Sequence, residues 1–419
     1  MRGAAGAALA SLPALAACVQ DPRTLPQLAL GPRPGSAHNR VLTRSFEFPI
    51  LPGRGDELRA LLKERRLFAR PMPGVHFARA AQIGNERLTL GVIFDDRFES
   101  AVNFLVENGA ALDHALRLCA GYPAGAALDP AAFSELLSSP AVSVPDKLFF
   151  TAYDHAESEV RACLAVYENF LALLRGASGV SDRQLPFLVD RFLMSELPPF
   201  AIDDAQRPRV RPGSLPFRPH LTNTLTMLQP LLEGALEPKR VVPCSRARLE
   251  RIERFVGKHW TVREVFEFIL TEGEFAVRDV GEHPLAALHT LHFARIAVVD
   301  TPRGASMLFS SVYDGDFTQY VLDFGSRVAD QIDFIWGLTQ NYPVRGCRDV
   351  PAFIRWLRAG QVDVEDFFSA HGNVTLLQLQ KAAALRDRLV EFSRALPPDG
   401  RGLRARLAAF ARDQQALLS

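Results

Sequence analysis

The 419-residue sequence lacks the closely spaced cysteines that hold metals or build disulfide frameworks. No Cys-x-x-Cys occurs. The five cysteines are scattered over most of the chain, at positions 18, 119, 163, 244 and 347. Zinc modules and small disulfide-rich domains both need short cysteine spacings, so neither class is indicated.

The sequence also lacks an excess of one charge and a long apolar run in its main part. It has 48 basic and 47 acidic residues, a formal net charge of +1, and no long basic block. A surface that neutralises phosphates is therefore not indicated, and nucleic acid is not an expected partner. After the N-terminal segment, charges or prolines interrupt every apolar run before the ~20 residues that a membrane span needs.

Several motifs of well-known enzyme classes are absent as well. The sequence contains no Gly-x-Gly-x-x-Gly, no P-loop, no Gly-x-Ser-x-Gly and no His-Glu-x-x-His. Their absence argues against a nucleotide-dependent enzyme, an α/β hydrolase and a zincin, although it leaves unfamiliar chemistry open.

The N-terminal segment, residues 1–43, differs in composition from the rest. Arg2 precedes an uncharged, Ala-rich run that ends at Cys18, which is the layout of a short signal peptide. The tetrapeptide 15–18, Leu-Ala-Ala-Cys, is similar to the lipobox of bacterial lipoproteins, which implies a lipid anchor at Cys18 and a place in the cell envelope. The alternative is a disordered extension of a cytoplasmic protein, continued by the Pro-rich residues 21–40.

Two copies of one tetrapeptide divide the remaining chain. His-Phe-Ala-Arg occurs at His76–Arg79 and again at His292–Arg295, 216 residues later. Further markers follow both copies in the same order, at offsets of 216 to 220: an apolar run, an acidic turn, a Phe, a Tyr-Pro pair and a double Phe. The period is too long for a solenoid, so this order indicates one domain that was copied once.

The first copy has the pattern strand, helix, strand, strand, helix. These elements are predicted at 46–50, 56–66, 75–83, 88–94 and 98–119. A weaker strand at Lys147–Tyr153 and a closing helix at Glu157–Leu174 would complete a ferredoxin-like βαββαβ unit. The second copy repeats the order and adds a helix at Val262–Leu270.

The sequence therefore predicts an α+β fold made of two ferredoxin-like repeats with extra helices. The expected segments are the N-terminal segment 1–43, repeat one 44–175, a Pro-rich linker 176–221, repeat two 222–395 and a C-terminal helical segment 396–419.

With these repeats the chain resembles the dimeric α+β barrel superfamily. Its members pair two ferredoxin-like units, often by gene duplication, so that two sheets close around a shared interior. The resemblance covers roughly residues 44–175 and 222–395 and implies a pseudo-twofold α+β barrel. The nearest likeness is to bacterial proteins of unassigned function with a His-Phe-Ala-Arg strand and a Tyr/Phe-Asp-Gly turn.

The superfamily includes metal-free monooxygenases, members with no known reaction, and haem enzymes similar to dye-decolourising peroxidases. These peroxidases carry a Gly-x-x-Asp-Gly motif whose Asp acts on peroxide above the iron. Residues 311–315, Ser-Val-Tyr-Asp-Gly, are similar, with Ser in place of the first Gly. The likeness makes Asp314 and Arg295 candidate catalytic residues, and His371 the candidate axial ligand of a haem. In the alternative interpretation, Asp314 only ends a strand and Asp316 caps the next helix.

His76 and His292 are candidate ligand-binding residues. Alternation along a strand predicts that each His shares a sheet face with the following Ala, with Phe and Arg on the other face. If the His face is interior, the two imidazoles approach a common cavity and can bind a metal, haem or a proton. The simpler interpretation is a buried His that a neighbouring strand or helix satisfies.

Arg79 and Arg295 are the second pair of candidates. A charged group in the middle of a strand must reach solvent, pair with a carboxylate or bind an anion. Asp95 or Asp96 and Asp314 are the expected carboxylate partners, so a structural ion pair in each copy is predicted, with anion or propionate binding as the alternative.

Two functions remain open from the sequence. One is a small-ligand-binding or accessory protein that uses the barrel interior. The other is a haem-binding, peroxidase-like oxidoreductase. Whether the chain is an enzyme stays open.

Overall fold

The computed structural model describes residues 41–95, 97–153, 155–194, 222–256, 259–272, 283–372, 374–397 and 401–418. The predictions of a signal peptide and of a lipid anchor at Cys18 lie outside these residues, as do Asp96 and residues 195–221 of the predicted linker.

The described chain is a mixed α+β protein with two antiparallel sheets, as the sequence predicts. It divides into two compact units. The sheet unit contains the described residues of Gly31–Glu157 and Ile202–Leu376, and the helical unit those of Ser158–Ala201 and Leu377–Ser419. The two parts of the sheet unit are called the first half (41–157) and the second half (222–376) below.

The first sheet has the strand order β4-β1-β3-β2-β9. Its strands are β1 (Val41–Pro49), β2 (Val75–Ile83), β3 (Arg87–Asp95), β4 (Ser143–Val144) and β9 (Val364–Ser369). The second sheet has the order β5-β7-β8-β6. Its strands are β5 (Asp146–Thr151), β6 (Thr222–Pro230), β7 (Leu291–Thr301) and β8 (Gly304–Asp314).

The last long strand of each half pairs with the sheet of the other half. β5, from the first half, pairs with β7, and Phe149 lies opposite Arg295. β9, from the second half, pairs with β2, and Phe367 lies opposite Arg79. A self-contained repeat would keep this strand in its own sheet, whereas here each sheet is completed by the other half.

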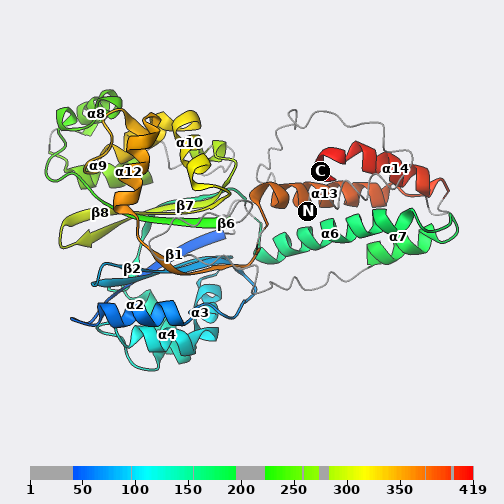
Figure 1. Cartoon of the computed structure of the whole chain (residues 1–419), viewed down its shortest axis with the longest axis horizontal. Helices are drawn as coiled ribbons and strands as arrows, with labels where there is room; N and C mark the ends of the chain where they lie inside the picture. The colour runs from blue at the N-terminus through cyan, green and yellow to red at the C-terminus, as the bar shows by residue number, and fades with distance from the viewer. Residues whose placement is uncertain are drawn as a thin grey trace. The chain divides into compact units, whose positions relative to one another are not determined.

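Figure 1 shows the layers of the sheet unit: helices cover the outer side of each sheet, and the other sides of the two sheets face each other. On the first sheet lie α2 (Gly55–Glu64), α3 (Phe98–Glu107), α4 (Gly109–Leu116) and α5 (Pro130–Ser138). On the second lie α8 (Pro243–Val256), α9 (Val262–Thr271), α10 (Phe317–Arg327), α11 (Ala329–Trp336) and α12 (Val350–Gly360). Each helical layer buries its own apolar core against its sheet.

The predicted helix 98–119 is interrupted. It consists of α3 and α4, which break at Asn108. The Asn108 side chain donates to Phe104 O at 2.9 Å and accepts from Arg70 N at 2.8 Å. A Cβ on Gly109 would lie 2.1 Å from Ala127 O, so the chain can pass that point only with glycine there. The equivalent region of the second half breaks in the same way, into α10 and α11.

One buried carboxylate organises the same loop in both halves. Asp113 accepts a 2.7 Å hydrogen bond from Tyr122 Oη, and Asp333 accepts a 2.6 Å bond from Tyr342 Oη. Both pairs precede short 3-10 turns, and Asp113 and Asp333 are 220 positions apart. The Tyr-Pro marker of the sequence therefore corresponds to a shared piece of structure.

The helical unit is formed by the closing helices and the C-terminus. Its elements are α6 (Glu157–Ala177), α7 (Leu185–Met194), α13 (Leu376–Arg394), α14 (Leu403–Asp413) and α15 (Gln415–Leu418). Residues such as Phe170, Leu185, Leu385 and Leu418 form its separate apolar core. Among the described residues, no helix combines the length and apolar character that crossing a membrane requires.

Candidate functional site

The candidate residues gather where the two sheets face each other. On β2 and β7, Ala78 and Ala294 pack into the helix-side cores. The alternate residues therefore point to the opposite face. There Phe77 and Phe293 meet edge to face, with ring centroids 5.2 Å apart, and the two arginines follow two residues later on each strand.

The predicted orientation of His76 and His292 is wrong. Both residues sit at β-bulges, because the register shifts between Val75 and Phe77 and again between Leu291 and Phe293. An extra residue at a bulge breaks the simple alternation of faces. Each imidazole contacts the Phe of the other half, His76 with Phe293 and His292 with Phe77, both with centroids 5.9 Å apart. The two histidines thus belong to one aromatic cluster between the sheets.

A carboxylate holds each of these histidines. His76 Nε2 lies 2.7 Å from Asp95 Oδ1, and His292 Nε2 lies 2.8 Å from Asp314 Oδ1. The second oxygen of each Asp accepts a backbone N–H at the start of a long helix: Asp95 from Glu157 N at 2.7 Å and Asp314 from Leu376 N at 2.6 Å. The N-terminus of a helix attracts a negative group, so each carboxylate binds a helix start as well as a histidine.

The two halves differ at the next residue of the cluster. In the first half His76 Nδ1 lies 3.0 Å from His371 Nε2, which the swapped end of β9 supplies. The equivalent residue after β5 is Tyr153, whose ring contacts His292 with centroids 6.1 Å apart. His292 Nδ1 and Tyr153 Oη are both buried, and neither has a hydrogen-bond partner among the described residues. Burial and the nearby Asp314, Asp95 and Glu157 carboxylates raise the pKa of Tyr153 well above its usual value.

Arg79 and Arg295 lie together between the sheets, two residues after Phe77 and Phe293. They are 5% and 2% exposed. A Cβ on Gly91 of β3 would lie 3.0 Å from Arg79 Nε and 3.2 Å from Arg295 Nη2, so both guanidinium groups pack over this glycine. Arg295 Nη1 donates to Asp146 Oδ1 at 3.2 Å, while Nε of each arginine has no partner in the described part of the chain.

The predicted ion pairs of Arg79 with Asp95 and of Arg295 with Asp314 are therefore wrong, and the alternative partner Asp96 lies outside the described residues. Asp95 and Asp314 bind the histidines, and the carboxylate beside the arginines is Asp146, at the start of β5. Asp146 also accepts from Ser45 Oγ at 3.4 Å. Sequence reasoning missed Asp146 because strand exchange brings it to β7, and no local spacing in the sequence signals that exchange.

The electrostatics of this group are unbalanced. Burial lowers the pKa of Arg79 well below its usual value, the neighbouring Arg295 lowers it further, and Asp146 opposes both. Burial also lowers the pKa of Arg295, against the attraction of Asp146 and Glu47. Burial raises the pKa of Asp146, and the Arg295 guanidinium opposes this. Guanidinium groups stay protonated in proteins. Of the two buried carboxylates that act on them, Asp146 pairs with Arg295 and Glu47 pairs with Arg87 at 2.6 Å, so Arg79 has no ion pair of its own among the described residues.

The candidate haem ligand does not fit a haem in this arrangement. Haem iron is held by an imidazole nitrogen with an open coordination direction. His371 Nε2 is engaged by His76, its side chain is buried, and the Phe77 ring stands 5.7 Å from it. Among the described residues, no group of three or more His, Cys, Asp and Glu side chains is arranged to hold a metal ion.

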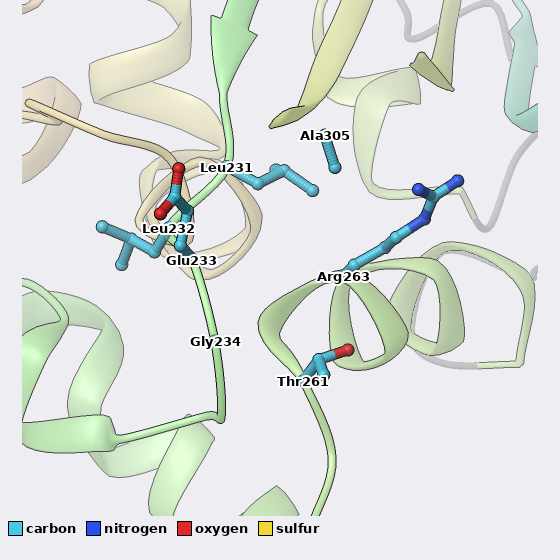
Figure 2. A pocket seen from close by; sticks show the side chains of 7 residues that line it. All are labelled: Leu231, Leu232, Glu233, Gly234, Thr261, Arg263 and Ala305. Carbon is cyan, nitrogen blue, oxygen red and sulfur yellow. The ribbon is translucent and has the colours of Figure 1, made fainter. Parts of the chain in front are cut away.

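A pocket elsewhere on the sheet unit contains none of the candidate residues. It has a volume of ≈ 180 Å³ and is lined by Leu231, Leu232, Glu233, Gly234, Thr261, Arg263 and Ala305. Figure 2 shows the Arg263 side chain beside this pocket. Its guanidinium is paired with Asp300 at 2.6 Å and Glu267 at 3.2 Å, so its charge is already balanced.

No family model, curated protein or solved structure matches the chain. The chemistry of the site therefore has to follow from its own residues.

Proposed function

We propose that this protein binds a small organic anion between its two sheets, with Arg79 and Arg295 as the anchoring groups. The observation that supports the proposal is the charge imbalance: of the two buried guanidinium groups, only Arg295 pairs with a carboxylate in the described chain, Asp146, and the nearby Glu47 pairs with Arg87. An uncompensated buried charge costs several kcal/mol. A ligand carboxylate or another oxyanion would balance the second guanidinium and occupy donors that have no partner in the described chain.

The surroundings of the arginines favour an aromatic or otherwise apolar body on the anion. Phe77 stacks on Phe367 with centroids 5.9 Å apart, and Phe149 stacks on Phe293 at 6.1 Å. Phe149 and Phe367 are the strand neighbours of the two arginines. An arylcarboxylate can combine contacts with these rings and a bidentate bond to a guanidinium.

A second inference concerns the architecture. We infer that the halves are two ferredoxin-like repeats of one duplicated domain, arranged as in the dimeric α+β barrel superfamily. The repeated order of elements, the paired helix breaks and the repeated Asp–Tyr bond support this. The exchange of β5 and β9 also supports it, because equivalent strands change places.

A binding or accessory role is proposed in preference to catalysis. Both carboxylate oxygens of Asp314 are engaged, one by His292 and one by Leu376 N, and Arg295 is paired with Asp146. The alternative, a haem-binding peroxidase-like oxidoreductase, would need His371 to leave His76. An absorbance spectrum after addition of hemin tests this alternative: a Soret band that disappears in His371→Ala would support it.

Titration calorimetry with benzoate and with benzamide, its neutral analogue, tests the anion site. We expect benzoate to bind and benzamide to bind much more weakly. Arg79→Met should weaken benzoate binding by roughly 10- to 100-fold, because a hydrogen bond to a charged group contributes about 1.5–3 kcal/mol. Arg70→Met is the matched control, since the Arg70 side chain is exposed and pairs with Glu107 at 2.8 Å. Equal affinities for the two compounds, or no binding of benzoate to the wild type, would overturn the proposal.

A further inference from the structure

The groups around His76 and His292 have the same arrangement of hydrogen bonds. In each half an Asp at the end of a strand accepts from a bulge histidine and from the first backbone N–H groups of a helix. The residue that contacts the histidine lies in an equivalent turn in each half. Tyr153 N donates to Thr151 Oγ1, and His371 N donates to Ser369 Oγ, both at 3.3 Å. Tyr153 and His371 are therefore structural equivalents, and the two clusters can be compared atom by atom.

The carboxylates determine which imidazole nitrogen carries the proton. An ionised carboxylate only accepts hydrogen bonds, so Nε2 of His76 and of His292 must be the protonated nitrogen. In a neutral ring this leaves Nδ1 as an acceptor. In the first half, His371 Nε2–H supplies the donor for His76 Nδ1 at 3.0 Å, and the chain Asp95–His76–His371 is complete.

In the second half the corresponding series of hydrogen bonds is incomplete. His292 Nδ1 is an acceptor that receives no donor in the described chain, and Tyr153 Oη is a buried hydroxyl with no acceptor there. Tyr153 is 4% exposed and His292 0%. Burying an acceptor and a donor without partners costs about 1–3 kcal/mol for each group. At the position where His371 supplies the donor in the first half, the second half has Tyr153.

We propose that His292 and Tyr153 form a binding site for one neutral hydroxyl group of a small aromatic alcohol. The ligand hydroxyl donates its proton to His292 Nδ1 and accepts the Tyr153 hydroxyl, which satisfies both orphaned atoms at once. Aromatic rings contact both members of the pair: Phe77 lies 5.9 Å from His292 and Phe293 lies 5.2 Å from Tyr153, measured between ring centroids. These rings favour an aromatic body on the ligand over an aliphatic one.

This site shares the Phe77 and Phe293 rings with the anion site proposed above, but it does not depend on the arginines. Phe77 and Phe293 follow the histidines directly, and the arginines come two residues further along the same strands. The two sites use different polar groups: a neutral donor and acceptor here, and guanidinium groups there. Each can fail without the other.

The test uses the full chain with phenol and anisole as probes, and calorimetry or ligand-observed NMR as the readout. Anisole has the same ring and an ether oxygen but no O–H to donate to His292. We expect phenol to bind the wild type about tenfold more tightly than anisole, as one hydrogen bond of about 1 kcal/mol or slightly more implies. Because both probes are measured on the unaltered protein, this comparison does not depend on a variant that folds.

Two variants assign the binding to this pair. Tyr153→Phe removes the hydroxyl donor and should reduce phenol affinity several-fold. Tyr153→His copies the first half and should abolish phenol binding, because the new imidazole would donate to His292 Nδ1 as His371 donates to His76. Tyr167→Phe, in the helical unit, is the control that should change nothing. Benzoate binding should be unchanged in Tyr153→Phe, and phenol binding unchanged in Arg79→Met.

Three results would overturn the proposal. These are equal affinities for phenol and anisole, phenol binding that Tyr153→Phe does not weaken, and no binding of phenol. In the last case, a His292 Nδ1 nitrogen-15 shift typical of a hydrogen-bonded acceptor would identify water as the occupant in place of a ligand.

Discussion

Single residues decide the chemistry between the sheets, since buried polar groups there have few partners. Arg295 has Asp146, but Arg79 adds a second guanidinium to the same carboxylate. Removing one member of a buried charge pair costs much more than removing a charge that is in excess. The two residues should therefore respond to substitution with different magnitudes.

Asp146→Asn is expected to lower the free energy of unfolding by roughly 3–5 kcal/mol, because it removes the carboxylate that pairs with the buried Arg295. Arg79→Met keeps a long apolar side chain and removes the excess charge, so a change below about 1 kcal/mol, or a gain, is expected. Urea denaturation of the ligand-free protein measures both. If Arg79→Met lowered the free energy of unfolding as much as Asp146→Asn, the Arg79 charge would not be in excess, and the anion site would be contradicted.

At the scale of elements, two devices place the candidate residues: the bulges and the exchanged strands. The bulges at His76 and His292 turn both imidazoles toward the other half. The exchange of β5 and β9 brings Asp146 and Tyr153 to β7, and His371 to β2. Each site therefore combines residues from both halves of the chain.

Strand exchange predicts that cutting the chain between the halves leaves them associated. A protease site inserted between residues 201 and 215 would yield two fragments that each supply a strand to the other's sheet. Separating them would expose unpaired edges of β2 and β7, the inner faces of both sheets, and the core of the helical unit, to which both fragments contribute. We expect the cut protein to elute as one species in size-exclusion chromatography under native conditions and to separate in urea. Two species in native buffer would show that the exchanged strands do not hold the halves together.

At the scale of the whole molecule, burial suppresses the ionisation of every tyrosine. The sequence has six tyrosines, and burial is the largest cause of a raised pKa in each: Tyr122, Tyr153, Tyr167, Tyr313, Tyr320 and Tyr342. In the unfolded chain these groups ionise near pH 10. The folded protein therefore holds more protons than the unfolded chain in alkaline solution.

Stability should consequently fall as the pH rises above about 10 and should be insensitive to these groups below it. Each proton retained only in the folded state contributes a slope of roughly 1.4 kcal/mol per pH unit. Urea denaturation from pH 8 to 11, with tyrosinate absorbance at 295 nm as a second signal, measures the effect. We expect tyrosinate to appear only together with unfolding. A smooth ionisation near pH 10 in the folded protein would contradict the burial of these rings.

Much of the secondary structure could be predicted from the sequence. Strand β2 has the predicted bounds, Asp316 caps α10 through Gln319 N at 3.0 Å, and the extra helix predicted at Val262–Leu270 is α9 with a capping box at Thr261. These features depend on local patterns: alternation of apolar residues, side-chain caps and turn residues. The duplication itself stays a proposal, supported by the matching order of elements.

The sequence by itself determined the α+β composition, the order of the elements and the residue types gathered on two related strands, because these follow from contacts between near neighbours. Only the tertiary structure decided what those residues do. Two bulges reversed the expected orientation of the histidines, and strand exchange gave the arginines Asp146 in place of Asp95 and Asp314. Partners that lie 149 positions apart, as Arg295 and Asp146 do, are chosen by strand pairing, which no local pattern in one sequence encodes.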